Sequence, residues 1–241
     1  MLGLRRLTSG RSAVILLIGM WPVRQALLYL VLSGACVAAA LLASSRSARA
    51  DSVQHMWLHY DYMVAPGGES FAPDPGSIRL VVDAFAAHGI ELHVDEQHTA
   101  LPYHALLDLG GSVNLNDPEC ALQGLGAGDV VSFAGLKAQY FHPTANHEWH
   151  YAIFGDLSAC SGETGVATLA GDDLAVTLGA RRRDGLPITP YVEGGMLMHE
   201  LGHNLGLLHG GATDLQNWKA NYLSVMNYRF EYGIPYASTP G

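Results

Sequence analysis

The sequence predicts an α/β fold, and three observations lead to this prediction. A strand-like segment, a helical pattern and a second strand-like segment follow one another at residues 56–63, 77–88 and 90–94, an order that opens a parallel α/β sheet. Further short apolar stretches of strand length follow after residue 148. A second helical segment then carries ionisable side chains at a spacing that places them on one face.

The first three elements are recognised from the periodicity of their side chains. Residues 56–63 are rich in aromatic and apolar side chains that partly alternate, as in a strand. In residues 77–88 the apolar side chains recur at helical spacing, and Gly89 follows as a stop signal. Residues 90–94 alternate again and predict the second strand.

The middle of the chain has a less regular pattern. Residues 95–147 contain Asn, Asp, Pro and Gly at many positions and predict a long surface excursion, with one helix at 129–141 that Gly135 interrupts. The basic run at 181–183 is expected to be a solvated loop, with a processing site or a substrate-contact patch as alternatives. The later strands are predicted at 149–154, 165–169 and 174–178.

The first fifty residues have the features of a secretory signal peptide. They contain six Arg and no Asp or Glu, an apolar run at 26–43, and the small-x-small sequence Ala48-Arg49-Ala50 before Asp51. Residues 1–50 are therefore predicted to be a signal peptide, and residues 51–241 one domain that is secreted to an extracellular or periplasmic space. An uncleaved membrane anchor is the alternative, because about 18 apolar residues nearly span a bilayer.

Without this leader the chain is strongly acidic. Residues 51–241 contain seven Lys or Arg against 22 Asp or Glu, a formal net charge of −15. Such a chain has no electrostatic footprint for nucleic acid or anionic membranes, so neither is an expected partner, and no stable membrane association is expected after leader cleavage. Cys120 and Cys160 are expected to form a disulfide in an oxidising compartment, with free buried thiols as the alternative.

The segment that begins at His199 combines residues that suit a catalytic metal ion. On a helix His199 and His203 lie about 40° apart and one turn from each other, so both imidazoles face the same way. Two such rings can hold one zinc ion. Glu200 lies to the side of the pair, where its carboxylate can reach metal-bound water as a general base without being a ligand.

Gly206 is expected to end this helix, because glycine adopts the left-handed conformation without steric cost. The helix itself is expected to begin near residues 191–193. Beyond Gly206 the chain turns back, and His209 can supply a third ligand. Three protein ligands leave one coordination position for water, which distinguishes a catalytic zinc site from a structural one.

The sequence HELGHNLGLLH at residues 199–209 resembles H-E-x-x-H-x-x-G-x-x-H, the signature of the metzincin zinc proteases. A second element of that family, a methionine-containing turn below the metal, is similar to SVMNY at residues 224–228. The resemblance implies that Met226 is a hydrophobic floor under the three histidines. It implies that Tyr228 ligates zinc or stabilises the transition state. Each of these two residues alone would be interpreted as core packing.

The resemblance also implies a fold. It implies a mixed five-stranded sheet with a backing helix, a zinc-binding active-site helix and a small irregular C-terminal part. The strand at 165–169 would be the one antiparallel edge strand, above the cleft, where an extended peptide can pair with it. Gly210 matches none of the common metzincin branches at the position after the third histidine, which leaves the subfamily open. Residues 230–241 are too short and too rich in Pro and Gly for the C-terminal helix of metzincins, so a truncated chain is one expectation.

These features predict a secreted endopeptidase that uses Zn²⁺ to hydrolyse protein or peptide substrates. One alternative is a secreted zinc-binding module without protease activity. Another keeps the chemistry but acts on a different amide, for example in a cell-wall peptide. His142, His147 and His150 form a further histidine cluster, but the spacing of zinc ligands is absent there, so a second metal site is the less favoured interpretation.

Overall fold

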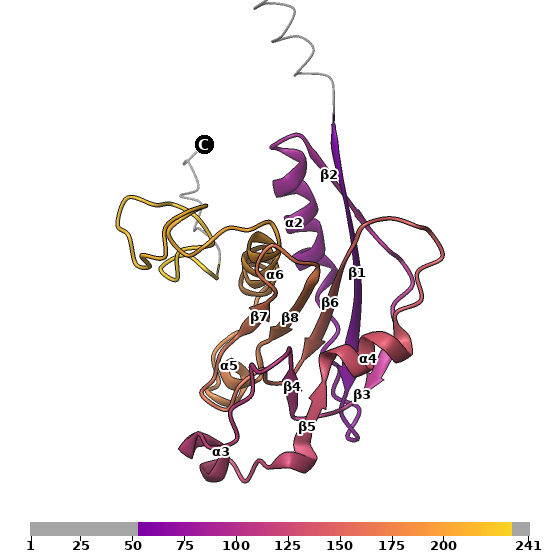
Figure 1. Ribbon diagram of the computed structural model, residues 1–241, viewed down its shortest axis with the longest axis vertical. Helices are drawn as coiled ribbons and strands as arrows, with labels where there is room; N and C mark the ends of the chain where they lie inside the picture. Colours follow the sequence, from indigo (N-terminus) through magenta and orange to yellow (C-terminus); the bar gives the residue numbers. More distant parts are fainter. Residues whose placement is uncertain (1–52, 233–241) are drawn as a thin grey trace, which may run out of the picture. The chain divides into compact units, whose positions relative to one another are not determined.

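The structure is a computed structural model, and it describes residues 53–232. It is an α/β fold in which one mixed sheet is packed against several helices (Figure 1). The main path of the sheet has the order β2 (Ile90–Val94), β1 (Gln54–Val64), β6 (Trp149–Gly155), β8 (Asp173–Thr177) and β7 (Gly165–Ala167). β7 is antiparallel to β8, and the other pairs on this path are parallel, which confirms the predicted antiparallel edge strand.

The side chains of the central strands build a hydrophobic core on each face of the sheet. In β6, Phe154 packs on one face and Ile153 on the other. The first core is closed by α2 (Pro75–Ala86) and α6 (Pro190–Asn204), and the second is closed in part by α4 (Phe133–Tyr140). Both faces of β6 are therefore buried, as its nearly continuous apolar sequence predicts.

A buried carboxylate joins α2 to α6. Glu193, in the first turn of α6, accepts hydrogen bonds from the Ser77 hydroxyl at 2.6 Å and from the Asp74 backbone N–H at 2.7 Å. Burial raises the pKa of Glu193, although both hydrogen bonds act in the opposite direction. The contact fixes the beginning of α6 on α2, and with it the direction in which the rest of α6 points.

Most elements that were predicted from periodicity are confirmed. β1 and β2 match the strands predicted at 56–63 and 90–94, and α2 matches the helix predicted at 77–88. β7 ends at Ala167, earlier than predicted. α6 begins at Pro190, directly after its N-cap Thr189. Between residues 53 and 232, no helix combines the length and the apolar character that crossing a bilayer requires. The predicted signal peptide lies outside the described residues.

The single helix predicted at 129–141 is wrong. Val130–Ser132 is strand β5, which pairs in parallel with β4 (Leu106–Asp108), and α4 follows directly after it. The reason is local, because the Ser132 side chain accepts a hydrogen bond from the backbone N–H of Gly135 and caps the helix at that point. Helix formation therefore starts only after the short strand.

The region predicted to be an irregular excursion, residues 95–147, holds further short elements. These include helix α3 (Pro118–Leu122) and strand β3 (Ala100–Pro102), which pairs in parallel with residues 62–64 of β1. With β3 the sheet has six strands in the described part of the chain, one more than the five predicted, because β3 spans only three residues and shows no periodic pattern. Cys120 in α3 is bonded to Cys160, and the predicted disulfide is thus confirmed. Because the bond closes a loop with a sequence separation of 40, it stabilises the fold by about 4 kcal/mol in the chain-entropy model.

The basic run at 181–183 is not a loop, contrary to the prediction. It lies in the short helix α5 (Gly179–Arg183). Arg183 donates a hydrogen bond of 2.5 Å to the carboxylate of Asp156, whose side chain is buried. The run therefore holds the chain between β8 and α6 in place, because its charge satisfies a buried acid.

Candidate active site

α6 presents His199 and His203 one turn apart, and backbone carbonyls fix both rings. The Nδ1 atom of His199 lies 2.6 Å from the carbonyl oxygen of Val225, and Nδ1 of His203 lies 2.8 Å from that of Leu207. Since a carbonyl oxygen only accepts, each Nδ1 carries a hydrogen and donates it. Each Nε2 atom therefore has a free lone pair, which is the tautomer that metal ligation requires.

The two lone pairs face each other. The Nε2 atoms of His199 and His203 are 3.1 Å apart. Two neutral acceptors at this separation have no proton to share, so the arrangement favours a cation bound by both. Two nitrogen ligands at 2.0–2.1 Å from a tetrahedral zinc ion would be about 3.3 Å apart, close to the observed separation. The spacing of the two Nε2 atoms therefore fits two ligands of one zinc ion.

His209 joins the pair from the segment after α6. Gly206 has a φ of +83°, and its N–H donates to the carbonyl of His203 at 2.9 Å, so the helix ends where the sequence predicted. Each of the three histidines then places a ring nitrogen within 4.8 Å of the other two. We call His199, His203 and His209 the histidine triad. Three imidazoles suit a zinc ion that keeps one coordination position for solvent.

The triad histidines are neutral at pH 7. Burial lowers the pKa of His199 to about 4, although the hydrogen bond to Val225 acts in the opposite direction. Burial also lowers the pKa values of His203 and His209. Neutral rings are the form that binds a metal ion, so protons do not compete for the triad near neutral pH.

Met226 packs against α6 at the level of the triad. Its side chain is 1% exposed, and a β-carbon on Gly202 would overlap its sulfur. The buried amide of Asn227 donates to the carbonyls of Lys219 at 2.7 Å and of Tyr222 at 2.9 Å. These hydrogen bonds hold the turn that contains Met226. The absence of a side chain at Gly202 gives the turn room against the helix.

Glu200 is buried, and one of its carboxylate oxygens has no partner. The residue is 2% exposed, and Oε2 makes no hydrogen bond within the described part of the chain. Burial raises the pKa of Glu200 well above its usual range, and the charges of Glu231 and Glu163 add to this effect. A buried carboxylate oxygen without a partner costs folding free energy, which makes Glu200 a candidate functional residue.

Glu200 and the triad line a cavity of about 520 Å³. One wall is β7, where Gly165 lies so near that a β-carbon there would overlap the Glu200 carboxylate. Tyr228 also lines the cavity, and its ring centre lies 4.3 Å from that of His209. Burial and the neighbouring acids raise the pKa of Tyr228, so its hydroxyl remains a hydrogen-bond donor at pH 7.

The sequence does not predict Asn204 as a residue of the site, although its side chain links the end of α6 to the sheet. Its side-chain amide donates to the carbonyls of Thr168 at 2.9 Å and of Asp173 at 3.0 Å, and its Oδ1 accepts from Nδ1 of His150 at 3.1 Å. These partners lie more than thirty positions away in the sequence, so no local pattern could identify the role. These hydrogen bonds hold the C-terminal end of α6, directly after His203, against the loop between β7 and β8 and the first residue of β8.

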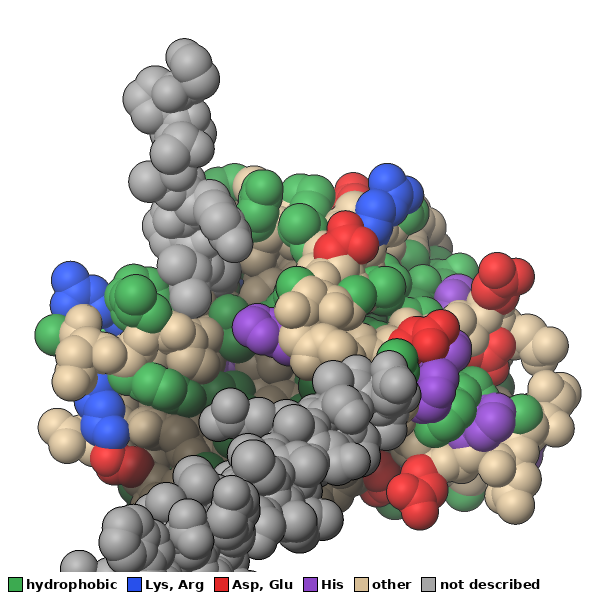
Figure 2. All heavy atoms as spheres, turned by 90° about the horizontal axis from the view of Figure 1, so that it is seen from above, with side chains coloured by type: hydrophobic (Ala, Val, Ile, Leu, Met, Phe, Trp, Pro, Cys, Tyr) green, Lys and Arg blue, Asp and Glu red, His purple; other side chains and the backbone are tan. Residues whose placement is uncertain are grey.

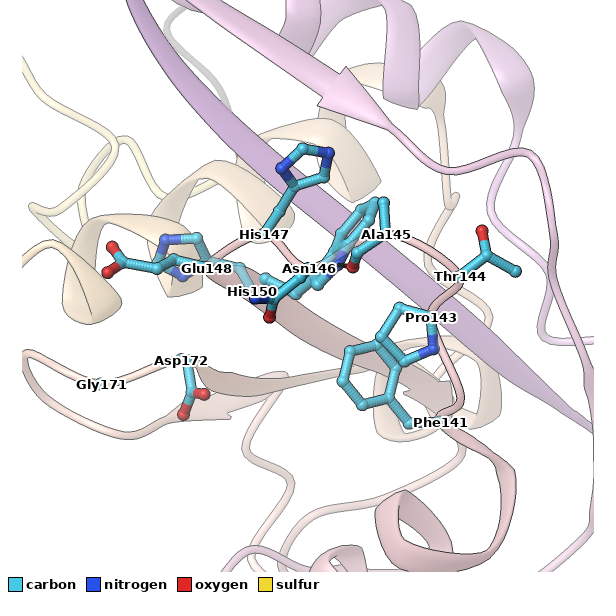
Figure 3. Close-up of a pocket in the computed structure, with 11 residues that line it drawn as sticks. Phe141, Pro143, Thr144, Ala145, Asn146, His147, Glu148, His150, Gly171 and Asp172 are labelled. Atoms are coloured by element: carbon cyan, nitrogen blue, oxygen red, sulfur yellow. Dashed lines mark hydrogen bonds between the residues drawn. The ribbon is translucent and has the colours of Figure 1, made fainter.

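The second histidine cluster of the sequence, His142, His147 and His150, does not converge on one point in the described part of the chain. His147 stacks on Trp57 with ring centres 4.3 Å apart, and His150 donates to Asn204. Figure 3 shows His147 and His150 beside a pocket of about 660 Å³ that no triad histidine lines. This pocket is larger than the cavity beside the triad, so size alone does not identify the candidate active site.

Comparisons with known proteins add little to this geometry. No protein-family model matches the chain, and no match is found among curated proteins. Among solved structures, the chain is similar to archaemetzincin from Methanopyrus kandleri, with 18% sequence identity and a TM-score of 0.39, over 67% of this chain and 82% of that chain. A likeness of this degree does not decide an activity.

Proposed function

We propose that the chain is a secreted zinc-dependent endopeptidase of the metzincin type, with residues 51–241 as its catalytic domain. One observation carries this proposal: the facing Nε2 atoms of His199 and His203 lie on the same helix as the unpartnered carboxylate oxygen of Glu200. A structural zinc site has no need of a base beside it. The combination therefore supports a catalytic site.

Secretion is part of the same proposal. Residues 1–50 would be removed as a signal peptide. The disulfide between Cys120 and Cys160 supports an extracellular or periplasmic location, because such bonds persist in oxidising compartments.

The histidine triad would hold Zn²⁺. When bound, zinc lowers the pKa of a water molecule toward neutrality and polarises the scissile carbonyl. Glu200 accepts the proton that the attacking water loses and donates it to the leaving amine nitrogen as the C–N bond breaks. Glu200 lies on the same helix as His199 and His203 and lines the same cavity, a position that suits both steps.

Two further parts of the cavity would act on the substrate. Tyr228 donates a hydrogen bond from its hydroxyl to the carbonyl oxygen as this oxygen gains negative charge. β7 ends the sheet and lines the cavity, so an extended peptide can pair with its outer backbone edge. Protein or peptide chains are therefore the proposed substrates.

A digestion of mixed peptides tests this proposal. The full chain is incubated with a peptide library with and without a chelator, zinc is then restored, and the cleavage sites are read by mass spectrometry. We expect cleavage of internal peptide bonds that the chelator stops and zinc restores.

Two other outcomes would contradict the proposal. Zinc binding without any cleavage would indicate a zinc-binding module. Cleavage confined to cell-wall peptides would indicate an amidase that uses the same chemistry on another substrate.

A further inference from the structure

A second group of metal-ligating side chains lies on β1 and β2, at the edge of the sheet opposite β7. It consists of His55, Glu91 and His93, which we call the edge cluster, and its three ligand atoms lie within 4.8 Å of one another. No residue of the histidine triad belongs to it. The edge cluster is therefore a group of possible metal ligands separate from the triad.

The parallel pairing of the two strands brings these side chains together. His55 is the register partner of Glu91, and Trp57 is the register partner of His93. Residues two positions apart on a strand point to the same face, so all four side chains share one face of the sheet. The backbone hydrogen bonds of two paired strands hold this arrangement, which does not depend on a loop.

The distances within the edge cluster are close to those between ligands of one ion. Nδ1 of His55 lies 2.9 Å from Nε2 of His93. Glu91 places one carboxylate oxygen 3.4 Å from the His55 nitrogen and the other 3.9 Å from the His93 nitrogen. Ligand atoms around a tetrahedral zinc ion lie about 3.3–3.6 Å apart, so small side-chain movements bring all three into one coordination shell.

Stacked rings orient the two imidazoles. The ring centre of Trp57 lies 5.9 Å from that of His55 and 5.3 Å from that of His93, with interplanar angles of 30° and 16°. His147 stacks on Trp57 as well, at 4.3 Å. Figure 2 shows histidine and acidic side chains gathered together on one side of the molecular surface. Stacking removes rotamer freedom before a ligand arrives, which reduces the entropic cost of binding.

We propose that the edge cluster binds a second divalent transition-metal ion, of the class of Zn²⁺, Ni²⁺ and Cu²⁺. Two imidazoles and one carboxylate suit these ions, whereas Ca²⁺ and Mg²⁺ prefer shells of oxygen ligands. In such a site each ring would offer one nitrogen lone pair to the ion, and the Glu91 carboxylate would offset part of the ion's charge. The side chains of His55, Glu91 and His93 are 45%, 56% and 37% exposed, so the remaining coordination positions face solvent and binding is weaker than at the buried triad.

Metal stoichiometry tests this site independently of any peptidase activity. The full chain is dialysed against increasing Zn²⁺, and bound zinc per chain is measured by mass spectrometry. We expect two ions per chain for the wild type. We expect one for a variant with both His55→Asn and His93→Asn, and two for a matched control with His88→Asn and His142→Asn, which alters two exposed histidines elsewhere.

A His203→Asn variant separates this site from the triad, because it should lose the tighter ion and keep the weaker one. The inference is overturned if the wild type binds only one ion or if the His55/His93 variant still binds two. It is also overturned if the control variant loses an ion as well, since surface histidines in general would then bind zinc. Far-UV circular dichroism verifies that each variant is folded.

Discussion

Gly202 lies inside α6, directly before His203, and a hydrogen atom in place of a side chain lets the Met226 turn approach the helix. The neighbouring residues of the site are constrained in comparable ways. Gly165 leaves space for the Glu200 carboxylate, and the carbonyl of Val225 sets the tautomer of His199. The geometry of the site thus depends on residues outside the histidine triad and Glu200.

Replacing Gly202 with alanine should destabilise the protein. The new β-carbon would overlap the Met226 sulfur, and overpacking of this kind costs about 1–3 kcal/mol. Denaturant unfolding of Gly202→Ala should show this loss, and the loss should vanish when the same change is made in a Met226→Ala background. Gly135→Ala in α4 is the control, since its β-carbon comes no nearer than 3.7 Å to another side chain. Equal effects of Gly202→Ala in both backgrounds would contradict the contact.

Hydrogen bonds fix both ends of α6 to neighbouring elements. Glu193 joins its first turn to α2, and Asn204 joins its last residue to the loop between β7 and β8. Beyond this end, Gly206 reverses the chain and brings the Leu207 carbonyl onto His203. The direction of the triad rings is therefore a property of the whole helix and its cap.

The cap at Gly206 gives a prediction for this element. Alanine in the left-handed conformation costs about 1–2 kcal/mol, so Gly206→Ala should lower the free energy of unfolding by that amount. It should also weaken zinc binding, measured by competition with a chelator, because the Leu207 carbonyl that orients His203 would shift. Gly67→Ala is the control, since its β-carbon meets no atom within 4 Å and its φ is not positive. Indistinguishable zinc affinities for the two variants would exclude the role of the cap.

The molecule as a whole shows which features a sequence can reveal. The strand β1 and the helix α2 follow from periodicity, and β6 follows from its nearly continuous apolar sequence. The triad follows from the spacing of its histidines along α6 and the segment after Gly206. β3, β4 and β5 span three residues each, which is too short for a periodic signal, and the helix at 129–141 was mispredicted for that reason. The contact of Gly202 with Met226 and the edge cluster depend on strand register and packing between distant segments, which no local pattern contains.

Stability of the whole fold should depend on a buried histidine, His59, that belongs to neither proposed metal site. His59 is 5% exposed and lies 2.9 Å from a carboxylate oxygen of Asp95 and 3.3 Å from one of Asp61. Burial alone would lower the pKa of His59, but the hydrogen bonds and charges of the two acids outweigh it and raise this pKa above its ordinary value of 6.5. The stabilisation is therefore complete below pH 6.5 and is lost as the pH rises through the folded-state pKa.

The difference in unfolding free energy between wild type and His59→Gln, measured across pH, isolates this group from the triad. We expect the difference to be largest below pH 6.5 and to shrink as the pH rises through the folded-state pKa of His59. A difference that stays constant, or that grows with pH, would show that His59 is neutral in the folded protein.

The central claim is that Glu200 is a base beside a zinc ion held by the triad. The most direct test is the rate of peptide hydrolysis by Glu200→Gln, compared with wild type at equal zinc content per chain, with the exposed Glu96→Gln as the matched control. General acid–base catalysis contributes about 10²–10⁴ to a rate. We predict that Glu200→Gln binds zinc but hydrolyses peptides at least about a hundredfold more slowly, while Glu96→Gln matches the wild type. Hydrolysis by Glu200→Gln at the wild-type rate would contradict the account.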